Sequence, residues 1–232
     1  MNEKVHPDSA RVVVIGGGII GCSVAYHLAE QGCDVVLLER DQLTSGTTWH
    51  AAGLMTTFGS GSETIYGIRK HAMELYKRLE EETGQHTGFL PCGFIELAAD
   101  KDRLEEYRRI AAFNRFQGND IHELSPQEVK NLFPFVELDH VEAGFYAEND
   151  GRINPVDVTM AMAKGARMKG AKLFERTPVR KILTDKGAVA GVRTDQGDIH
   201  SEFVVNCAGM WARQLGEQNG VIIPNQAAEH YY

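Results

Sequence analysis

The sequence predicts an α/β protein whose first part is a βαβ unit and whose middle part is an inserted α+β region. Two observations predict this fold class. Between residues 11 and 40, two short apolar runs enclose a glycine-rich turn and a helical pattern. From residue 86 to residue 149, short apolar segments and charged helical segments break that order. The 232 residues suffice for one large domain or two small ones.

The turn after the first apolar run has the pattern Gly-x-Gly-x-x-Gly at Gly16, Gly18 and Gly21. The first glycine permits a tight turn, the second lets the backbone approach a pyrophosphate, and the third lets the helix pack closely on the sheet. Ile19 and Ile20 of this stretch are further candidate cofactor-binding residues, and a helical pattern follows through residues 24–29 and ends at Gly32. The N-terminus of this helix offers N–H groups and partial positive charge to the phosphates.

Glu39 stands at the end of the second apolar run, residues 35–38, and Arg40 follows it; both are candidate cofactor-binding residues. A carboxylate at this place accepts both hydrogen bonds from an adenosine ribose and repels a 2′-phosphate, so NADP is disfavoured. The strands, the helix, the glycines and the acid together predict a dinucleotide site. The alternative is a βαβ unit whose glycines serve only packing.

Composition and charge argue against several other classes of protein. The formal net charge of −8 disfavours nucleic acid or an anionic membrane as a partner. The four cysteines form no Cys-x-x-Cys pair and no metal-ligand cluster, so we expect reduced thiols and no metal. No run approaches the roughly 18 apolar residues of a membrane span. The first strand leaves no room for a targeting peptide before it, which predicts a cytoplasmic location.

The segment that follows, residues 41–54, is rich in glycine and in side chains with hydroxyl groups. It lacks the periodicity of a strand, or of a helix longer than about one turn. Ser45, Thr47 and Thr48 are small hydroxyl donors directly after the predicted ribose-binding strand. Two interpretations fit this composition equally: a loop that returns across the phosphates of a cofactor, and a connection rich in helix N-caps.

Residues 44–54, Thr-Ser-Gly-Thr-Thr-Trp-His-Ala-Ala-Gly-Leu, resemble the flavin-attachment segment of the dimethylglycine and sarcosine dehydrogenase family. That family belongs to the larger D-amino-acid-oxidase-like group of FAD-dependent oxidoreductases. Residues 148–155 and 228–231 extend the resemblance. It implies FAD as the cofactor, and a covalent bond between His50 and the 8α-methyl group of the flavin. Taken alone, a histidine beside Trp49 would be interpreted as structural.

The resemblance implies cofactor contacts along this segment and in the last third of the chain. In the segment they are Ser45, Gly46, Thr47, Thr48, His50, Ala52, Gly53 and Leu54. Later they include Val179, whose backbone would contact the adenine, and Ala208 and Gly209, whose lack of bulk would let the cofactor lie close. Trp211 is interpreted either as a packed tryptophan or as a wall of the flavin site.

The middle of the chain carries the predicted insertion, preceded by an amphipathic helix. Predicted helices cover residues 62–82 and 102–116, and predicted strands lie within residues 89–98, 121–124 and 143–147. Ser125, Pro126 and Glu128 have the pattern of a capping box with a proline at the first helical position. An inserted sheet with helices, and hence a second domain, follows from this order.

The last third of the chain begins with a helix. Asn154, followed by proline, is a good helix start, and the helical pattern runs to residue 168. A strand at residues 171–174, an antiparallel meander within residues 178–200 and an apolar strand at residues 203–206 follow. Asp150 and Asn154 are interpreted as turn and cap residues in preference to functional ones.

The resemblance divides the chain into two domains. An FAD-binding Rossmann-type domain covers residues 1–85 and 150–218, and an inserted, incomplete α+β substrate domain covers residues 86–149 and 219–232. Family members continue with the rest of the substrate sheet and with a domain that binds tetrahydrofolate. The chain therefore resembles an N-terminal fragment of the family, and its activity in this form stays open.

The implied function is the FAD-dependent oxidation of an N-methylated glycine, such as dimethylglycine or sarcosine, by hydride transfer to the flavin. His230 matches a position near the amine and is the candidate catalytic base. The electrons would pass to oxygen or to an electron-transfer flavoprotein. Two alternatives are a non-catalytic relative similar to the regulatory subunit of pyruvate dehydrogenase phosphatase, and an amine or amino-acid oxidase that binds FAD without a covalent bond.

Overall fold

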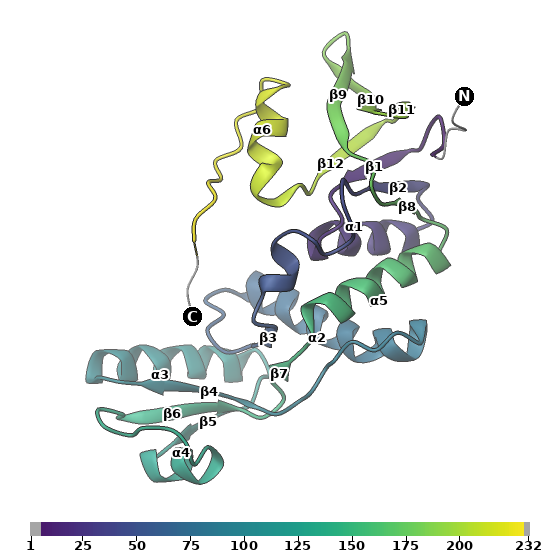
Figure 1. The fold of residues 1–232 in the computed structure, drawn as a ribbon. Helices are drawn as coiled ribbons and strands as arrows, with labels where there is room; N and C mark the ends of the chain where they lie inside the picture. Colours follow the sequence, from purple (N-terminus) through teal and green to yellow (C-terminus); the bar gives the residue numbers. More distant parts are fainter. Residues whose placement is uncertain (1–5, 230–232) are drawn as a thin grey trace. The chain divides into compact units, whose positions relative to one another are not determined.

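The computed structural model describes residues 6–229 of the chain (Figure 1). These residues form two compact units. Unit 1 takes its residues from Met1–Ala52, Leu79–His86 and Pro155–Tyr232, and unit 2 from Gly53–Arg78 and Thr87–Asn154. This partition differs from the sequence-based division in four places. Residues 53–78 and 150–154 group with the inserted region, and His86 and residues 219–229 group with unit 1.

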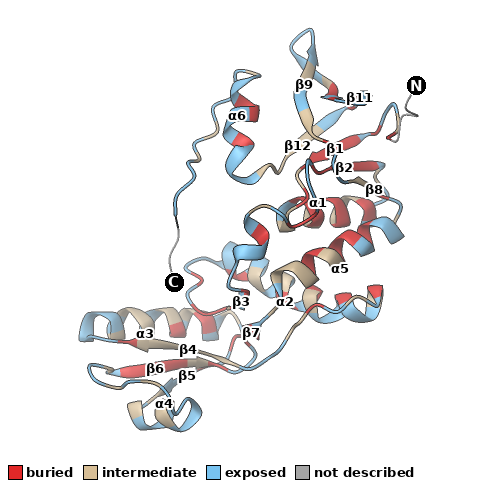
Figure 2. Cartoon of the chain, in the orientation of Figure 1, coloured by how far each residue is buried: buried red, intermediate tan, exposed pale blue. Residues whose placement is uncertain are grey.

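Unit 1 is built on a parallel four-stranded sheet in the order β12-β1-β2-β8. Its strands are β1 (Val12–Ile15), β2 (Val35–Leu38), β8 (Lys172–Phe174) and β12 (Phe203–Asn206). Every residue of the two central strands is buried (Figure 2). A parallel sheet that is covered on both faces requires such apolar strands, which explains why they read as uninterrupted apolar runs.

Two helices, α1 (Ile19–Glu30) and α5 (Pro155–Met168), lie side by side against the sheet (Figure 1). Gly165 permits their close approach, because a Cβ atom there would lie only 2.7 Å from the Tyr26 ring. Tyr26 is buried, and its hydroxyl donates to the two carboxylate oxygens of Glu82 at 2.9 and 2.8 Å. The ring is therefore held in place where α5 meets α1.

An antiparallel meander packs on the opposite face of the sheet. Its strands are β9 (Val179–Asp185), β10 (Ala188–Thr194) and β11 (Gly197–His200). Val192 and Ile199 of the meander share a buried cluster with Val13, Ile15 and Leu38 of the sheet. Since successive side chains of a strand point to opposite faces, the alternate residues of the sheet strands face the helices.

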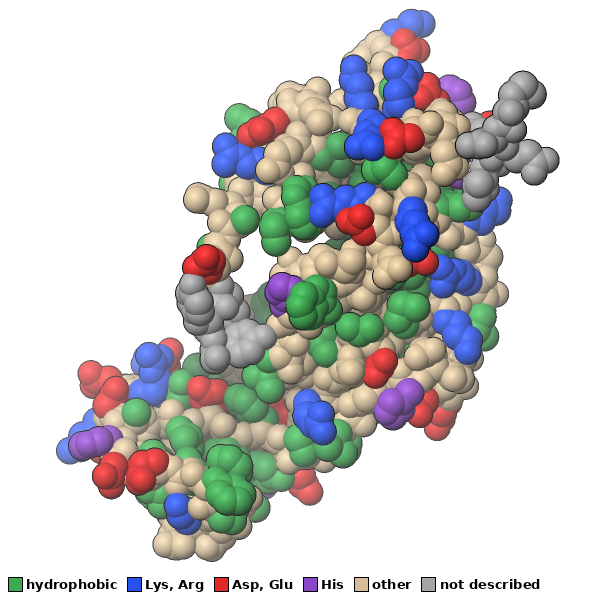
Figure 3. Space-filling model, viewed as in Figure 1, with side chains coloured by type: hydrophobic (Ala, Val, Ile, Leu, Met, Phe, Trp, Pro, Cys, Tyr) green, Lys and Arg blue, Asp and Glu red, His purple; other side chains and the backbone are tan. Residues whose placement is uncertain are grey.

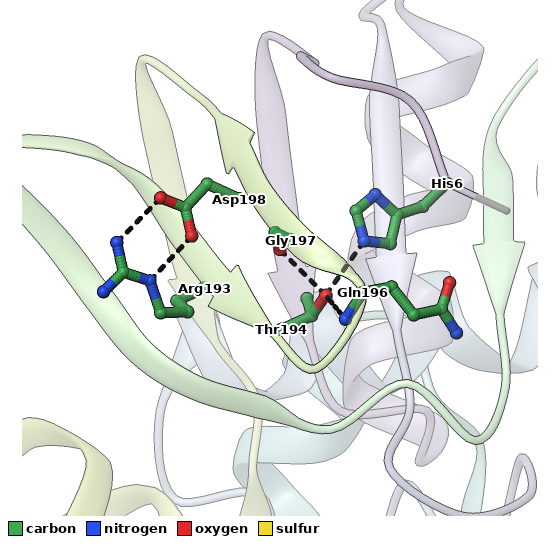
Figure 4. A network of polar contacts seen from close by, with 6 residues as sticks. All are labelled: His6, Arg193, Thr194, Gln196, Gly197 and Asp198. Carbon is green, nitrogen blue, oxygen red and sulfur yellow. Dashed lines mark hydrogen bonds and ion pairs between the residues drawn. The ribbon is translucent and has the colours of Figure 1, made fainter. Parts of the chain in front are cut away.

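The residues before β1 are attached to this meander (Figure 4). Nε2 of the buried His6 lies 2.9 Å from Thr194 Oγ1, and that hydroxyl donates to the carbonyl of Gly197 at 2.9 Å. Beside them, Arg193 donates to the two oxygens of Asp198 at 2.7 and 2.8 Å. These contacts hold the start of the described chain on the meander.

Unit 2 contains a three-stranded antiparallel sheet in the order β4-β6-β5. Its elements are β4 (Phe94–Ala98), β5 (Ile121–Leu124), β6 (Ala143–Ala147), α3 (Lys101–Phe116), α4 (Pro126–Leu132) and most of α2 (Glu63–Thr83). Phe145 packs on Tyr107 of α3, with ring centroids 5.7 Å apart. The neighbouring Gly144 faces Val129 of α4. The two helices thus cover opposite faces of the sheet (Figure 1).

The buried carboxylate of Asp150 links two segments of unit 2 beside a second, two-stranded sheet. There β3 (Leu54–Met55) pairs with β7 (Gly151–Arg152) in antiparallel fashion. Asp150, just before β7, is fully buried and accepts hydrogen bonds from the N–H and the hydroxyl of Thr57, both at 2.7 Å. Asp150 lies in the predicted turn, but its side chain binds a segment 93 residues away along the chain.

The structure confirms only part of the local structure that the sequence predicts for the inserted region. The capping box is confirmed, because Ser125 Oγ accepts from the Glu128 N–H and the Glu128 carboxylate accepts from the Ser125 N–H. The strand predicted within residues 89–98 forms only from Phe94 onward. Leu90 lies before this strand and forms an isolated antiparallel bridge with Arg152, in which each backbone N–H donates to the other residue's carbonyl.

Among residues 6–229, no helix is long and apolar enough to cross a bilayer. On the face drawn in Figure 3, basic and acidic side chains are interspersed. A single basic stripe of the kind that follows a phosphate backbone is not visible on that face.

Candidate functional site

A cavity of about 490 Å³ opens in unit 1 at the carboxyl ends of β1 and β2. Ile15 and Leu38, the last residues of these two strands, lie in its wall. This is the edge of a parallel sheet at which ligands bind in open α/β folds. The predicted cofactor-binding residues that line the cavity are Gly16, Gly18, Ile19, Ile20, Glu39, Arg40, Ser45, Gly46, Thr47, Thr48, Val179, Ala208, Gly209 and Trp211.

The glycine turn brings three segments of chain into close contact. Gly16 has a φ of +108°, and a Cβ atom there would collide with the carbonyl of Cys207. Gly21 is buried in α1, where a Cβ atom would collide with the carbonyl of Gly16. Any larger residue at either position would therefore push β1, α1 and the end of β12 apart. Gly21 serves this packing and does not line the cavity.

The N-terminus of α1 faces the cavity, and its N-cap residue supplies no capping side chain. Gly18 is the N-cap residue, it makes no side-chain cap, and the first turn of α1 contains no acidic residue. The N–H of Ile19 donates to Thr48 Oγ1 at 3.0 Å. The remaining N–H groups of the turn and the positive end of the helix dipole suit an anionic group in the cavity.

Glu39 is 9% exposed, and backbone donors hold its carboxylate in place. Oε2 accepts from the N–H of Gly17 at 2.6 Å, and Oε1 accepts from the N–H of Asp41 at 2.9 Å. Each carboxylate oxygen has a second lone pair, so both can still accept from a pair of neighbouring hydroxyl groups on a ligand. A ribose offers such a pair.

The segment after Glu39 lies against the glycine turn. Thr44 has a φ of 72°, and its N–H donates to the carbonyl of Gly17 at 3.0 Å. The N–H of Leu43 donates to Glu175 Oε1 at 2.7 Å. A short 3-10 helix, η1 (Thr47–His50), follows, with the exposed Thr47 and the buried Thr48 in the cavity wall. The segment is thus a loop that returns across the turn.

Arg40 and Trp211 form a stacked pair in the cavity wall. The guanidinium carbon of Arg40 lies 3.7 Å from the centroid of the Trp211 ring. Trp211 belongs to a second 3-10 helix, η2 (Gly209–Trp211), and is 38% exposed. Of its two interpretations from the sequence, the position of Trp211 fits a cavity wall better than a packed core.

Besides Gly21, four predicted residues do not line the cavity, and a fifth lies outside the described residues. His50 and Ala52 are exposed, and the His50 ring contacts the Trp49 ring with centroids 3.7 Å apart. Gly53 and Leu54 belong to unit 2, in and beside β3. His230 lies outside the described residues. His50 nevertheless ends the same short helix that places Thr48 in the wall.

Several lining residues were missed by the sequence reasoning. They are Gly17, Ala51, Pro178, Arg180, Cys207, Gln214, Leu215 and Gln218, apart from the strand ends named above. Most belong to the start of β9 or to α6 (Ala212–Glu217) and its flanks. Neither segment carries a local motif, so only the fold brings them to the cavity. Three of the missed residues could have been found from their neighbours, since Gly17 lies inside the glycine motif, Ala51 inside the segment of residues 44–54, and Cys207 directly before two predicted residues.

The cysteines near the glycine turn are held as thiols. Burial raises the pKa of Cys22 to about 12, and it raises the pKa of Cys207 in the cavity wall. A protonated thiol is a weak nucleophile and a weak metal ligand. Among the described residues there is also no group of three or more His, Cys, Asp or Glu side chains suited to a metal ion.

The fold and the cavity together define a dinucleotide-binding α/β protein. A family model described as "FAD dependent oxidoreductase" (DAO) matches residues 11–232, and the chain belongs to that family. The cavity fits the cofactor of this family. It combines an anion-binding helix end, a fixed carboxylate of the kind that binds a ribose, and a closely packed glycine turn at the end of β1.

Known proteins similar to the chain include dehydrogenases of methylated amines. The chain is 40% identical to mitochondrial sarcosine dehydrogenase of Homo sapiens and 41% identical to mitochondrial dimethylglycine dehydrogenase of Rattus norvegicus, each over 97% of its length. It is also 39% identical to the mitochondrial pyruvate dehydrogenase phosphatase regulatory subunit of Mus musculus. The chain spans only about a quarter of the length of these relatives, 25–26%.

Solved structures share the fold over nearly the whole chain. L-proline dehydrogenase from P. horikoshii superposes with a TM-score of 0.87 at 29% sequence identity. The match covers 93% of this chain and 57% of that one. The FAD-dependent oxidoreductase fold is therefore shared at the level of both sequence and structure.

Proposed function

We propose that the chain binds FAD in the unit 1 cavity and forms part of an enzyme that oxidatively demethylates an N-methylglycine, either dimethylglycine or sarcosine. One observation carries the proposal: the cavity has the elements of an adenosine-diphosphate site in a chain about 40% identical to dehydrogenases of those two amines. Because the chain spans a quarter of these relatives, the activity is proposed for a longer protein.

The residues of the cavity have distinct roles in this proposal. The start of α1 binds the pyrophosphate, and Glu39 accepts from the ribose hydroxyls. Val179, in the cavity wall, contacts the adenine through its backbone. Ala208 and Gly209 line the cavity with little or no side chain, so the flavin ring system can lie close to their backbone. When bound, FAD supplies the acceptor for two electrons from the substrate's N-methyl group.

The substrate amine must be neutral when it is oxidised, since an ammonium group has no lone pair to assist cleavage of the C–H bond. His230 is the proposed base, and its position lies outside the described residues. A base with a pKa near the working pH is the most efficient at removing the proton. Electron-transfer flavoprotein as the acceptor, and tetrahydrofolate as the carrier of the one-carbon unit, are proposals that concern the longer protein.

His50 provides the proposed covalent attachment. It stands two residues after Thr48, which lies in the cavity wall, and its ring is exposed. The short helix thus carries an exposed imidazole just beyond a residue of the cavity wall. Non-covalent binding is the alternative for the cofactor, and the absence of His50 from the lining residues favours it.

The second candidate function is that of a non-catalytic regulatory protein. The 39% identity to the phosphatase regulatory subunit, over 97% of the chain, favours it about as strongly as the dehydrogenase identities favour catalysis. Such a relative shares the fold, so the presence of a glycine turn does not separate the two candidates.

Acid precipitation of the purified protein after incubation with FAD tests the proposal. Flavin colour that stays in the washed pellet supports the covalent attachment, and His50→Ala is expected to move it to the supernatant. Colour in the supernatant of the unaltered chain supports non-covalent binding. A folded chain that takes up no flavin contradicts the proposal and favours the regulatory candidate.

A further inference from the structure

We propose that Thr48 is a positioning residue that ties the turn carrying His50 to the phosphate-binding end of α1, so that the imidazole is placed for bond formation with the flavin. The inference rests on the proposed function, because it assumes that FAD occupies the cavity and that His50 is the attachment point. It adds a role for Thr48 that is separate from contact with the cofactor.

The anchor is a single hydrogen bond between distant parts of unit 1. Thr48 is 8% exposed, and its Oγ1 accepts from the N–H of Ile19 at 3.0 Å, across 29 residues of sequence. The close approach depends on Gly18, where a Cβ atom would lie 2.9 Å from the same oxygen. The absence of a side chain at Gly18 therefore lets the Thr48 hydroxyl approach the N-terminus of α1.

Thr48 is the buried residue of η1, and the other residues of this short helix are exposed. The turn closes when the N–H of Ala51 donates to the carbonyl of Thr48 at 3.2 Å. A 3-10 turn this short has little stability of its own. The hydrogen bond of Thr48 therefore helps to set the position of the His50 backbone, together with the packing of η1 on α5.

Bond formation at His50 is sensitive to such placement. The new bond joins an imidazole nitrogen to the 8α carbon of the flavin and replaces one N–H bond and one C–H bond. The two protons and two electrons released reduce the flavin ring, and dioxygen then reoxidises it to give hydrogen peroxide. A shift of about 1 Å in the distance between reacting atoms can slow a reaction by about 100-fold.

The experiment compares Thr48→Val, which keeps the shape and removes the hydroxyl, with Thr48→Ser, which keeps the hydroxyl. Each full-length chain is prepared without flavin and mixed with FAD in air, and the acid-stable flavin is followed over time. Binding of ADP, which lacks the flavin, is measured by calorimetry. Thr83→Val is the matched control, because Thr83, the last residue of α2, is buried and its Oγ1 accepts from the N–H of Gln85 at 3.1 Å.

We expect Thr48→Val to slow attachment by about 10-fold or more and to weaken ADP binding by a clearly smaller factor, because its methyl group replaces the hydroxyl that accepts from the Ile19 N–H and the turn loses its anchor. Thr48→Ser and Thr83→Val should attach flavin at close to the rate of the unaltered chain. In the flavin-free protein, the amides of residues 49–51 should exchange with deuterium faster in Thr48→Val than in Thr83→Val, a readout that needs no cofactor.

Three outcomes overturn the inference. Attachment by Thr48→Val at the unaltered rate shows that the anchor does not place His50. A parallel loss of attachment and of ADP binding assigns Thr48 to phosphate binding or to folding. If the unaltered chain binds FAD but never attaches it, the covalent part of the proposed function fails first, and this result is distinguishable because it does not depend on any variant.

Discussion

Glu39 shows how a single residue acquires its role from its neighbours. The sequence places an acid after β2, but two backbone N–H groups, of Gly17 and Asp41, orient its carboxylate. Charge-assisted bonds of this kind are short and strong, so the carboxylate is already in place before a ligand arrives. The same negative charge opposes a phosphate on the ribose 2′-position.

Glu39→Gln should reduce discrimination between ADP and its 2′-phosphorylated analogue. The amide has no charge to repel the extra phosphate, and its NH₂ group would face a backbone N–H. We expect the ratio of the two dissociation constants to fall by about 10-fold, with ADP itself bound more weakly. Calorimetric titration with both nucleotides measures the ratio. Asp41→Asn, a neutralisation of the exposed neighbouring carboxylate, is the control, and an unchanged ratio in Glu39→Gln would refute the role of the charge.

At the scale of elements, side chains and glycines join segments that are far apart in the sequence. Gly165 lets α5 meet Tyr26 of α1, and Asp150 ties the turn before β7 to the segment after β3. Buried carboxylates require hydrogen-bond donors, because an unpaired buried charge is costly. Thr57 supplies two of the donors that satisfy Asp150.

Asp150→Ala should lower the free energy of unfolding by about 3 kcal/mol, because the N–H and hydroxyl of Thr57 would lose their acceptor inside unit 2. Urea denaturation followed by circular dichroism measures the change. Asp139→Ala, at an exposed carboxylate of the loop between α4 and β6, serves as the matched control and should stay within about 0.5 kcal/mol of the unaltered chain. Equal stabilities of the two variants would contradict the structural role of Asp150.

At the scale of the whole molecule, every residue that lines the cavity belongs to unit 1. The sheet of unit 2 has its own buried cluster around Phe145 and Ala111. A ligand that binds only the folded form stabilises the cooperative unit that holds its site. The two units should therefore respond differently to a nucleotide.

ADP at about 100 times its dissociation constant should stabilise unit 1 by about 2.7 kcal/mol and slow exchange of its most protected amides by about 100-fold. The amides of β1 and β2 are expected to report this effect, and those of β4 and β6 to change by less than about 3-fold. Hydrogen–deuterium exchange with mass spectrometry resolves the two sets. Equal protection of both sets would show that the units unfold together.

The sequence by itself determined the features that depend on neighbouring residues. The glycine turn, the apolar strands of a parallel sheet, the capping box at Ser125 and the fold class all follow from local spacing and side-chain chemistry, and family membership follows from the same residues. Such patterns act over a few residues, so they can be recognised before the chain is folded.

Only the tertiary structure decided which distant groups meet. The bond from Ile19 to Thr48 spans 29 residues, that from Thr57 to Asp150 spans 93, and that from Leu43 to Glu175 spans 132. The place of α6 in the cavity wall, and the absence of His50 from it, were equally hidden. A hydrogen bond between remote residues leaves no periodic trace in the sequence, because its geometry is set by the packing of whole elements and not by the residues beside it.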